Sequence, residues 1–450
     1  MSLVTLLIVL ATFVTAVILR PGLAFTSPLL LEGLDQLSAT AHPVFAMNPA
    51  LMNFVVAAFV GWGVAYRIAR GRNMTASVST VWILVILLYV YAWITLIWAP
   101  AMPSFVDTSD NTAFVANRLA KYFPYFILYV ALGPLLLAQV SELRAPLQFF
   151  LLMSGLVLVG LVVFGEFSEH RGLVVAGGEG GTARLPLASF SGTVILAAIF
   201  VRSGTFQKVF SILRPAVIVL ALIAIVGTGA RGALFTALLV ALIVWPLSQE
   251  QGVKGRYPQA VLLLLVLLLG VWIAFEIAGE VQGGRWRLGS EADAGVTQYS
   301  IYGRFAAQLQ MIKDVFVVWQ SSPSSIIFGV GNSASFALLP HHFYPHNVPL
   351  EVLAEEGLVG FSVYCAALVL AYRSFRRLLD KFRGDSSAVG DICFLFSVGF
   401  FYFLLSMKEG SFASVAHLTF FPAIVLANLD VRVSKRRLEH VQGASVTRLG

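Results

Sequence analysis

The sequence is poor in charge and in cysteine. Only 12% of its 450 residues are charged and 58% are hydrophobic, whereas soluble domains carry about 25% charged residues. A soluble globular protein is excluded by this balance. The two cysteines, Cys365 and Cys393, both lie in apolar stretches. Neither a disulfide framework nor a cysteine-based metal site is therefore indicated.

Long apolar stretches recur instead, each close to the ~20 residues that cross a bilayer as a helix. We predict an all-α polytopic membrane protein in which residues 1–450 form one integral membrane domain. The first stretch lacks the basic start and the small-residue cleavage site of a signal peptide, so we expect it to stay in the chain. Twelve spans are expected, at residues 2–19, 49–68, 77–98, 122–140, 146–165, 185–201, 212–229, 232–247, 259–279, 347–372, 391–407 and 413–429.

The segment between the first two spans, residues 20–48, is moderately apolar but contains Pro21, Pro28 and Pro43. We expect it to be re-entrant or to lie in the membrane interface. Lysine and arginine set the orientation, because cytoplasmic loops carry an excess of both. With both termini in the cytoplasm, nineteen of the 30 basic residues fall on that side. The net charge of +7 is explained by this bias rather than by nucleic-acid binding.

The longest loop, residues 280–346, faces outward in this orientation. Its first part, residues 280–300, is polar and rich in glycine. Residues 303–319 then predict an amphipathic helix that rests on the membrane or caps the bundle. The apolar face of this helix consists of Phe305, Leu309, Ile312, Phe316 and Trp319.

Three arginines on the outward side are candidates for anion binding. Arg231 lies in a glycine-rich break between two spans, where a charge needs a cavity or a partner. It either snorkels to lipid headgroups or binds phosphate, which guanidinium holds bidentately. Arg304 opens the amphipathic helix and Arg184 directly precedes a span. Each of these two is equally explained as a surface or flanking arginine.

His346, at the start of the tenth span, is the candidate base. Its imidazole, with a pKa near ~6.5, can accept a proton at neutral pH, although a surface histidine would look the same. His341 and His342 lie close by, but their spacing matches no defined metal site, and we expect no metal. Asn347 can cap the helix that follows.

Acidic residues occupy the first turns of that helix, at Glu351, Glu355 and Glu356. Acids there suit the helix dipole. The last two are deep enough that we expect them to face a polar cavity or an arginine. All three can equally be structural ion pairs.

The segment His346-Asn347-x-x-Leu350-Glu351-x-Leu353-x-Glu355-x-Gly357-x-x-Gly360 resembles the motif of the O-antigen ligase and polymerase superfamily. Three further motifs match in order, namely Ala230-Arg231-Gly232, Gly303-Arg304 and Gly329-Val330-Gly331. The likeness covers about residues 180–370. It departs at Ala230, where the family often has serine. It also departs at residues 191–194, where many members carry Pro-Asn, and this second difference leaves the role of Arg184 open.

The resemblance implies an inverting, metal-independent GT-C-type glycosyltransferase without a cofactor, in the bacterial inner membrane. Its donor would be a glycan on undecaprenyl diphosphate, and its acceptor lipid A-core or a growing glycan, at the periplasmic face. In a compatible mechanism Arg231 and Arg304 hold the diphosphate, and His346 deprotonates the acceptor. The expected substrate-binding residues are Arg184, Asn347, Glu351, Glu355 and His342.

Two alternatives stay open. An O-antigen or exopolysaccharide (capsule) polymerase would use the same donor, but polymerases tend to have two sizeable periplasmic loops, and the 166–184 loop is short here. A ligase is therefore favoured. A lipid or solute transporter is the more remote alternative, because its halves are commonly repeats and this sequence shows none.

Overall fold

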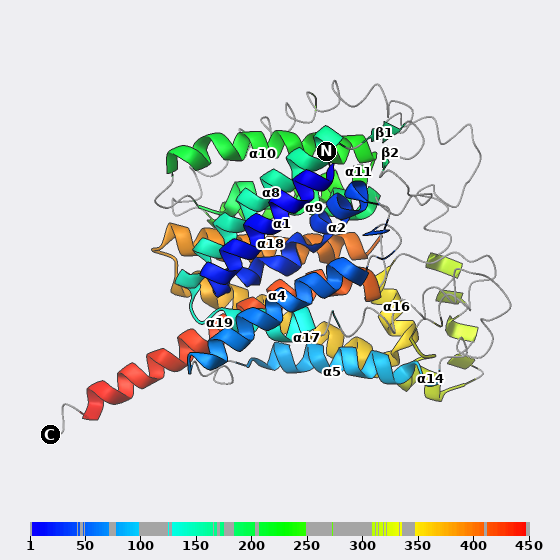
Figure 1. The fold of residues 1–450 in the computed structure, drawn as a ribbon. Helices are drawn as coiled ribbons and strands as arrows, with labels where there is room; N and C mark the ends of the chain where they lie inside the picture. Colours follow the sequence, from blue (N-terminus) through cyan, green and yellow to red (C-terminus); the bar gives the residue numbers. More distant parts are fainter. Residues whose placement is uncertain are drawn as a thin grey trace.

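A computed structural model gives the architecture. It describes residues 2–42, 44–45, 48, 50–71, 78–98, 125, 128–164, 166–168, 172–174, 184–202, 207–248, 272, 308–310, 312–313, 315–317, 319–320, 322–332, 334, 347–408 and 412–446. Within these ranges the chain is a helical bundle (Figure 1). The exception is a small antiparallel hairpin of β1 (Glu166–Ser168) and β2 (Gly172–Val174), with Phe167 opposite Leu173. The predicted helical fold class is confirmed for the described residues, apart from this hairpin.

The helices follow the apolar stretches closely. The α-helices are α1 (Ser2–Leu19), α2 (Ser27–Ala41), α4 (Ala50–Ala69), α5 (Thr80–Thr95), α8 (Arg144–Phe164), α9 (Arg184–Phe200), α10 (Gln207–Thr228), α11 (Arg231–Val244), α14 (Ser324–Phe328), α16 (Val348–Glu355), α17 (Gly357–Lys381), α18 (Ser386–Ser406) and α19 (Phe412–Val446). Short 3-10 helices are η1 (Pro21–Thr26), η3 (Gly133–Leu136), η4 (Val140–Glu142) and η6 (Trp245–Ser248).

Six helices among the described residues are long and apolar enough to cross a membrane. Four shorter apolar helices accompany them. A helical membrane protein is thus supported, while the count of twelve spans stays a prediction. Of the predicted span 259–279, the structure describes only Trp272. The described part of the span at 122–140 differs from a continuous helix: η3 begins beside Pro134, and Leu137 has an extended backbone. The six candidates are Leu51–Ala69, Val140–Val163, Lys208–Thr228, Gly357–Lys381, Ser386–Ser406 and Ala416–Arg437.

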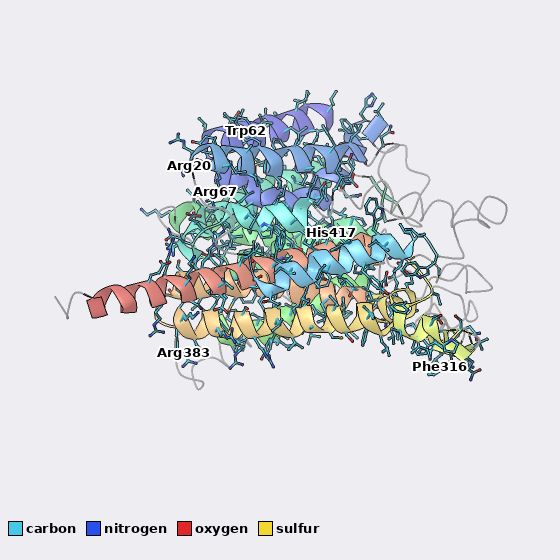
Figure 2. All side chains as sticks on the ribbon, turned by 90° about the horizontal axis from the view of Figure 1, so that it is seen from below. Arg20, Trp62, Arg67, Phe316, Arg383 and His417 are labelled. Atoms are coloured by element: carbon cyan, nitrogen blue, oxygen red, sulfur yellow. The ribbon has the colours of Figure 1, made fainter. Side chains whose placement is uncertain are left out.

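The bundle has two ends, which polar contacts identify. Arg67, near the end of α4, pairs with Glu142 at 2.8 Å, just ahead of α8. Gln148, early in α8, donates to the carbonyl of Arg202 at 3.1 Å, just after α9. Figure 2 shows Arg383 at the same end as Arg67. We call this the basic end. The starts of α9, α11 and α17 consequently lie at the opposite end, which we call the α16 end.

Residues 20–48 do not form the predicted re-entrant or interfacial segment. Pro21 and Pro28 each stand in the first turn of a helix, where the missing N–H carries no penalty. The helix α2 then runs through the bundle core, and its Leu30 and Leu34 are fully buried. Prolines that resembled interruptions in the sequence therefore initiate a buried helix.

The direction of α1 also differs from the predicted one. A Cβ on Gly160, near the end of α8, would lie 2.9 Å from a methyl of Thr5 and 2.9 Å from a methyl of Leu37. The start of α1 and the end of α2 therefore lie toward the α16 end. Figure 2 shows Arg20, which follows α1, at the basic end with Arg67. The last helix, α19, extends instead beyond the basic end (Figure 1). Termini on the same side, as predicted, do not agree with this arrangement.

A compact aromatic cluster holds α16 in place. Tyr89 of α5 packs on Phe412 of α19 with ring centroids 5.2 Å apart, and Val352 of α16 belongs to the same buried group. On the outer faces, by contrast, large apolar side chains are exposed, for example Leu7 of α1 and Trp62 of α4. Such faces suit contact with lipid.

Candidate functional site

The predicted span at 347–372 is broken at its start. It consists of α16 and α17, separated by Glu356, and Gly357 has a φ of 64°. That φ lies in the left-handed region, which glycine adopts without a Cβ penalty. The predicted cap is confirmed, because the Asn347 side chain accepts a hydrogen bond from the backbone N of Leu350 at 3.1 Å.

The Gly329-Val330-Gly331 turn packs directly against this break. The backbone N of Val330 donates to the carbonyl of Ala354 at 3.0 Å, and that of Gly331 donates to the carbonyl of Glu355 at 2.9 Å. These bonds satisfy carbonyls at the end of α16 that have no partner within the helix. A Cβ on Gly329 would lie 2.0 Å from the Glu355 oxygen. Two motifs that are separate in the sequence thus form one unit, the glycine contact (Gly329, Gly331 and Gly357).

Asn332 connects this unit to α5. Its side-chain amide donates to Oε1 of Glu356 at 2.7 Å, while its backbone N donates to Oγ1 of Thr95 at 3.0 Å. The hydroxyl of Tyr91 donates to the carbonyl of Phe328 at 2.8 Å. The turn is therefore held from both α5 and the break. Asn332 was not among the predicted site residues, although its position directly after the Gly-x-Gly motif is a usable signal.

Glu356 is fully buried, one residue ahead of the candidate span Gly357–Lys381. Its Oε2 has no hydrogen-bond partner among the described residues. Burial, and next the neighbouring carboxyl of Glu355, raise the pKa of Glu356 well above its usual range. The Asn332 amide opposes this shift. The environment thus favours a neutral carboxyl.

Glu351 has a structural role in this arrangement. Its Oε2 accepts a hydrogen bond from the backbone N of Phe412 at 2.8 Å, so it satisfies an N–H at the start of α19. Glu355 is likewise buried, with none of its surface exposed. Both had been predicted to bind substrate. That role stays a proposal, while the structure ties Glu351 to the packing of α16 on α19.

The arginines at the starts of α9 and α11 are placed by their backbones. Arg231 follows a break at Gly229, which has a φ of 67°, so the predicted interruption between two helices is present. Arg184 and Arg231 both begin helices at the α16 end, where α16 itself lies. Of the remaining predicted site residues, His342, His346 and Arg304 lie outside the described residues.

The predicted amphipathic helix is described in part, from residue 308 onward, and those residues are helical. Val315 and Trp319 pack against Ala354 and Leu350 of α16. The predicted apolar positions 309 and 316 are instead 44% and 55% exposed. The helix therefore contacts α16 along one edge and leaves apolar side chains outside, as expected for a helix that rests on a membrane.

No group of three or more histidine, cysteine or acidic side chains is placed to hold a metal ion within the described part of the chain. Of the acidic side chains near the glycine contact, Glu351 accepts a bond from a backbone N–H and Glu356 accepts one from the Asn332 amide. The site thus offers a rigid helix start, buried carboxyls and two helix-initiating arginines at one end of the bundle.

Comparison with known families agrees with this geometry. A family model described as O-Antigen ligase matches residues 216–365, from within α10 to within α17. The match includes the Arg231 break, the Gly-x-Gly turn and the whole of α16. No curated protein matches the chain. The resemblance found in the motifs is confirmed over this third of the chain, which matches the O-antigen ligase family.

Proposed function

We propose that this protein is a ligase-type membrane glycosyltransferase that moves a glycan from undecaprenyl diphosphate to a hydroxyl of lipid A-core. The family match over residues 216–365 carries this proposal. The matched residues include both the Arg231 break and the start of α16, which lie at the same end of the bundle. A binding site for a diphosphate and an acceptor needs such groups on fixed backbone.

In the proposed reaction, Arg231 and Arg304 bind the diphosphate and stabilise its charge as the glycosidic bond breaks. His346 takes the proton of the acceptor hydroxyl, whose oxygen attacks the anomeric carbon from the face opposite the leaving group. The new glycosidic bond is inverted, and undecaprenyl diphosphate leaves. Two guanidinium groups supply the positive charge, so the reaction as proposed uses no metal or cofactor.

The described residues support this assignment by fixing the backbone on both sides of the histidine. Asn347 follows His346 directly and caps α16. Gly331 and Asn332 precede the histidine segment and are bonded to Glu355 and Glu356. One attachment is at the start of α16, and the other is at the break that ends it. Such anchoring would preserve the position of a base without needing contacts along the whole loop.

The proposed membrane is the bacterial inner membrane, with the α16 end periplasmic and the basic end cytoplasmic. Arg20, Arg67 and Arg383 all lie at the basic end (Figure 2), as the positive-inside rule requires of cytoplasmic residues. The C-terminus would then be cytoplasmic. The direction of α1 would place the N-terminus on the periplasmic side.

A transfer assay tests the function. Detergent-purified protein is given a lipid-linked glycan donor and lipid A-core. His346→Ala and Arg231→Ala should each lower transfer about 100-fold or more. Arg383→Ala, an exposed arginine at the basic end, is the matched control and should keep full transfer. Full activity in both site variants would contradict the mechanism.

The acceptor is tested separately, in cells that lack the gene. A ligase mutant should accumulate long glycans on undecaprenyl diphosphate. Accumulation of single repeat units would identify a polymerase instead, and unchanged glycans would favour a transporter or another role.

A further inference from the structure

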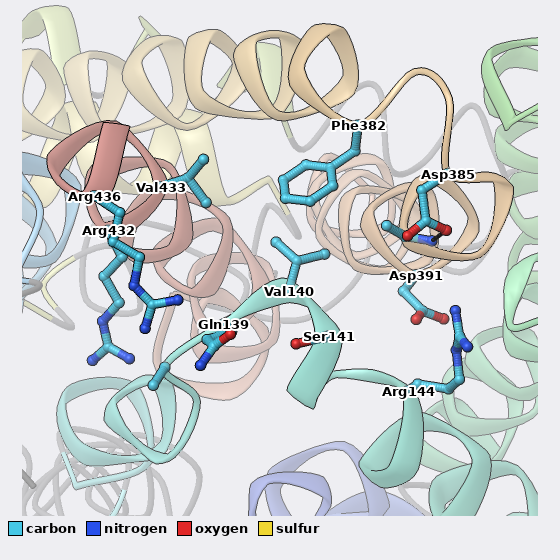
Figure 3. A pocket seen from close by; sticks show the side chains of 12 residues that line it. Gln139, Val140, Ser141, Arg144, Phe382, Asp385, Asp391, Arg432, Val433 and Arg436 are labelled. Atoms are coloured by element: carbon cyan, nitrogen blue, oxygen red, sulfur yellow. Dashed lines mark hydrogen bonds between the residues drawn. The ribbon is translucent and has the colours of Figure 1, made fainter. Parts of the chain in front are cut away.

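A pocket of about 420 Å³ lies at the basic end, remote from α16 (Figure 3). Its volume falls within the ~300–1,000 Å³ of small-molecule sites. Four parts of the chain line it: the segment leading into α8, the residue after α17, the first turns of α18 and the second half of α19. Helices that are distant in sequence thus build one cavity.

The pocket has walls of different charge. Arg432 and Arg436 of α19 line one side, and Figure 3 shows Asp391 of α18 on the other, with Arg144 of α8 beside it. The apolar side chain of Phe382 lies between these walls. The guanidinium of Arg432 donates to the carbonyl of Leu137, which holds it in place. Arg436 is exposed.

Two polar atoms in the pocket lack hydrogen bonds within the described residues. Asp391 is only 1% exposed, yet its Oδ1 has no donor. Nε of Arg144 likewise has no acceptor. Buried polar groups are normally satisfied. The pocket therefore calls for a ligand that brings a donor to Oδ1 of Asp391, while the arginines of the opposite wall favour a negatively charged group.

The pocket lies where candidate spans end. One span ends at Lys381 and the next begins at Ser386, on either side of Phe382 and Asp385. A third begins at Val140, which also lines the pocket. Span ends mark the level of lipid headgroups. A ligand with a headgroup can therefore reach the cavity from the membrane.

We propose that this pocket binds a phosphoethanolamine group. The phosphate is held by Arg432 and Arg436, because guanidinium binds phosphate oxygens in charge-assisted pairs. The ammonium donates to Oδ1 of Asp391. Free phosphate alone would leave Oδ1 of Asp391 without a hydrogen-bond donor. The group comes from phosphatidylethanolamine or from a soluble phosphoethanolamine compound, and the inference does not rest on the proposed function.

Native mass spectrometry of the full-length protein in detergent tests the proposal. Phosphatidylethanolamine should bind at least about tenfold more tightly than phosphatidylcholine, which has no N–H for Asp391. Asp391→Asn should remove most of this preference. Arg436→Gln should weaken both lipids, and Arg383→Gln, outside the pocket, should change neither.

Equal binding of the two lipids to the unaltered protein would overturn the proposal. So would unchanged phosphatidylethanolamine binding in Arg436→Gln, which alters an exposed side chain and leaves the core intact. O-phosphoethanolamine is the third probe. If it displaces the lipid at equal concentration, the ligand is soluble. If a large excess is needed, the ligand is the lipid.

Discussion

The Glu356 carboxyl is buried in the site with only half of its oxygens hydrogen-bonded. One carboxyl oxygen accepts a bond from Asn332, and the other has no partner in the described part of the chain. A buried polar atom without a partner costs about 1–3 kcal/mol. The carboxyl is therefore held by one bond from the Asn332 amide and lacks a complete set of hydrogen bonds.

Glu356→Gln is predicted to change how stability depends on pH. The raised pKa of Glu356 means that only the unfolded state ionises as pH rises above about 4.5, the usual value, which penalises the fold. Below that pH both states are protonated and the penalty is absent. The Tm of the unaltered protein should fall as pH rises from 4.5, and the Gln variant should lose part of this fall. Parallel pH profiles for both proteins, measured by thermal unfolding in detergent, would contradict it.

Tyr402→Phe tests a second carboxyl, that of Glu32, which is partly buried. Tyr402 of α18 donates to Oε2 of Glu32 in α2 at 2.6 Å. Phenylalanine removes the donor to the partly buried Oε2 of Glu32, so unfolding should become easier by about 1 kcal/mol. The variant Glu32→Gln/Tyr402→Phe should be less affected than the single Tyr402 variant. Thermal unfolding in detergent measures both, and equal Tm values for the single variant and the unaltered protein would refute the role.

At the scale of elements, local signals identified helix starts but missed a long-range break. The Asn347 cap and the interruption before Arg231 follow from neighbouring residues, and both are present in the structure. The division of the 347–372 span does not follow from neighbours. It depends on the turn at Gly329, which comes much earlier in the chain. Periodicity within a span carries no information about such a contact.

The same limitation affected α2. Prolines near a helix start and prolines in an interruption look alike in the sequence, because both interrupt an apolar pattern. The structure places Pro28 in the first turn of α2. The helix α2 packs against α8 and α9, and this burial shows that Pro28 begins a helix rather than interrupting one. No pattern in the neighbouring residues reveals such packing. The side-chain positions of the predicted catalytic residues stay predictions for a related reason, since they are set by loop geometry.

Gly357→Ala is predicted to disrupt the glycine contact. The new Cβ would lie 2.4 Å from the backbone N of Gly329, and the residue's φ of 64° is itself unfavourable for alanine. Nearby backbone cannot move away cheaply, so the variant should lose more than about 3 kcal/mol of stability. Gly384→Ala is the control, because its Cβ would meet nothing within 4 Å. Thermal unfolding in detergent compares them, and an equal Tm for both variants would refute the contact.

At the scale of the whole molecule, the direction of α1 decides where the N-terminus lies. The basic-residue count gave a self-consistent topology, but it assumed that residues 20–48 do not cross the bundle. Because α2 returns through the core, the start of α1 and the end of α19 lie toward opposite ends. Counting basic residues in the loops cannot detect a buried helix such as α2, although this helix adds one more crossing of the bundle and so reverses the direction of α1.

Cysteine labelling in intact membranes measures this arrangement. In a Cys365→Ser/Cys393→Ala background, Leu3→Cys and Arg383→Cys are predicted to react with an impermeant maleimide from opposite sides. Arg20→Cys should react from the same side as Arg383→Cys, since both residues lie at the basic end (Figure 2). Labelling of positions 3 and 383 from one side would refute the direction of α1.

Two attachments to α16, one at each of its ends, limit the length of the chain between Asn332 and Asn347. Asn332 is held at the break after α16, and Asn347 is held at the start of α16. The stretch between them must therefore span the distance between the two ends of this helix. The chain upstream of Ser322 carries no such restriction from these attachments. A foreign sequence grafted upstream of Ser322 should therefore leave both attachments to α16 intact.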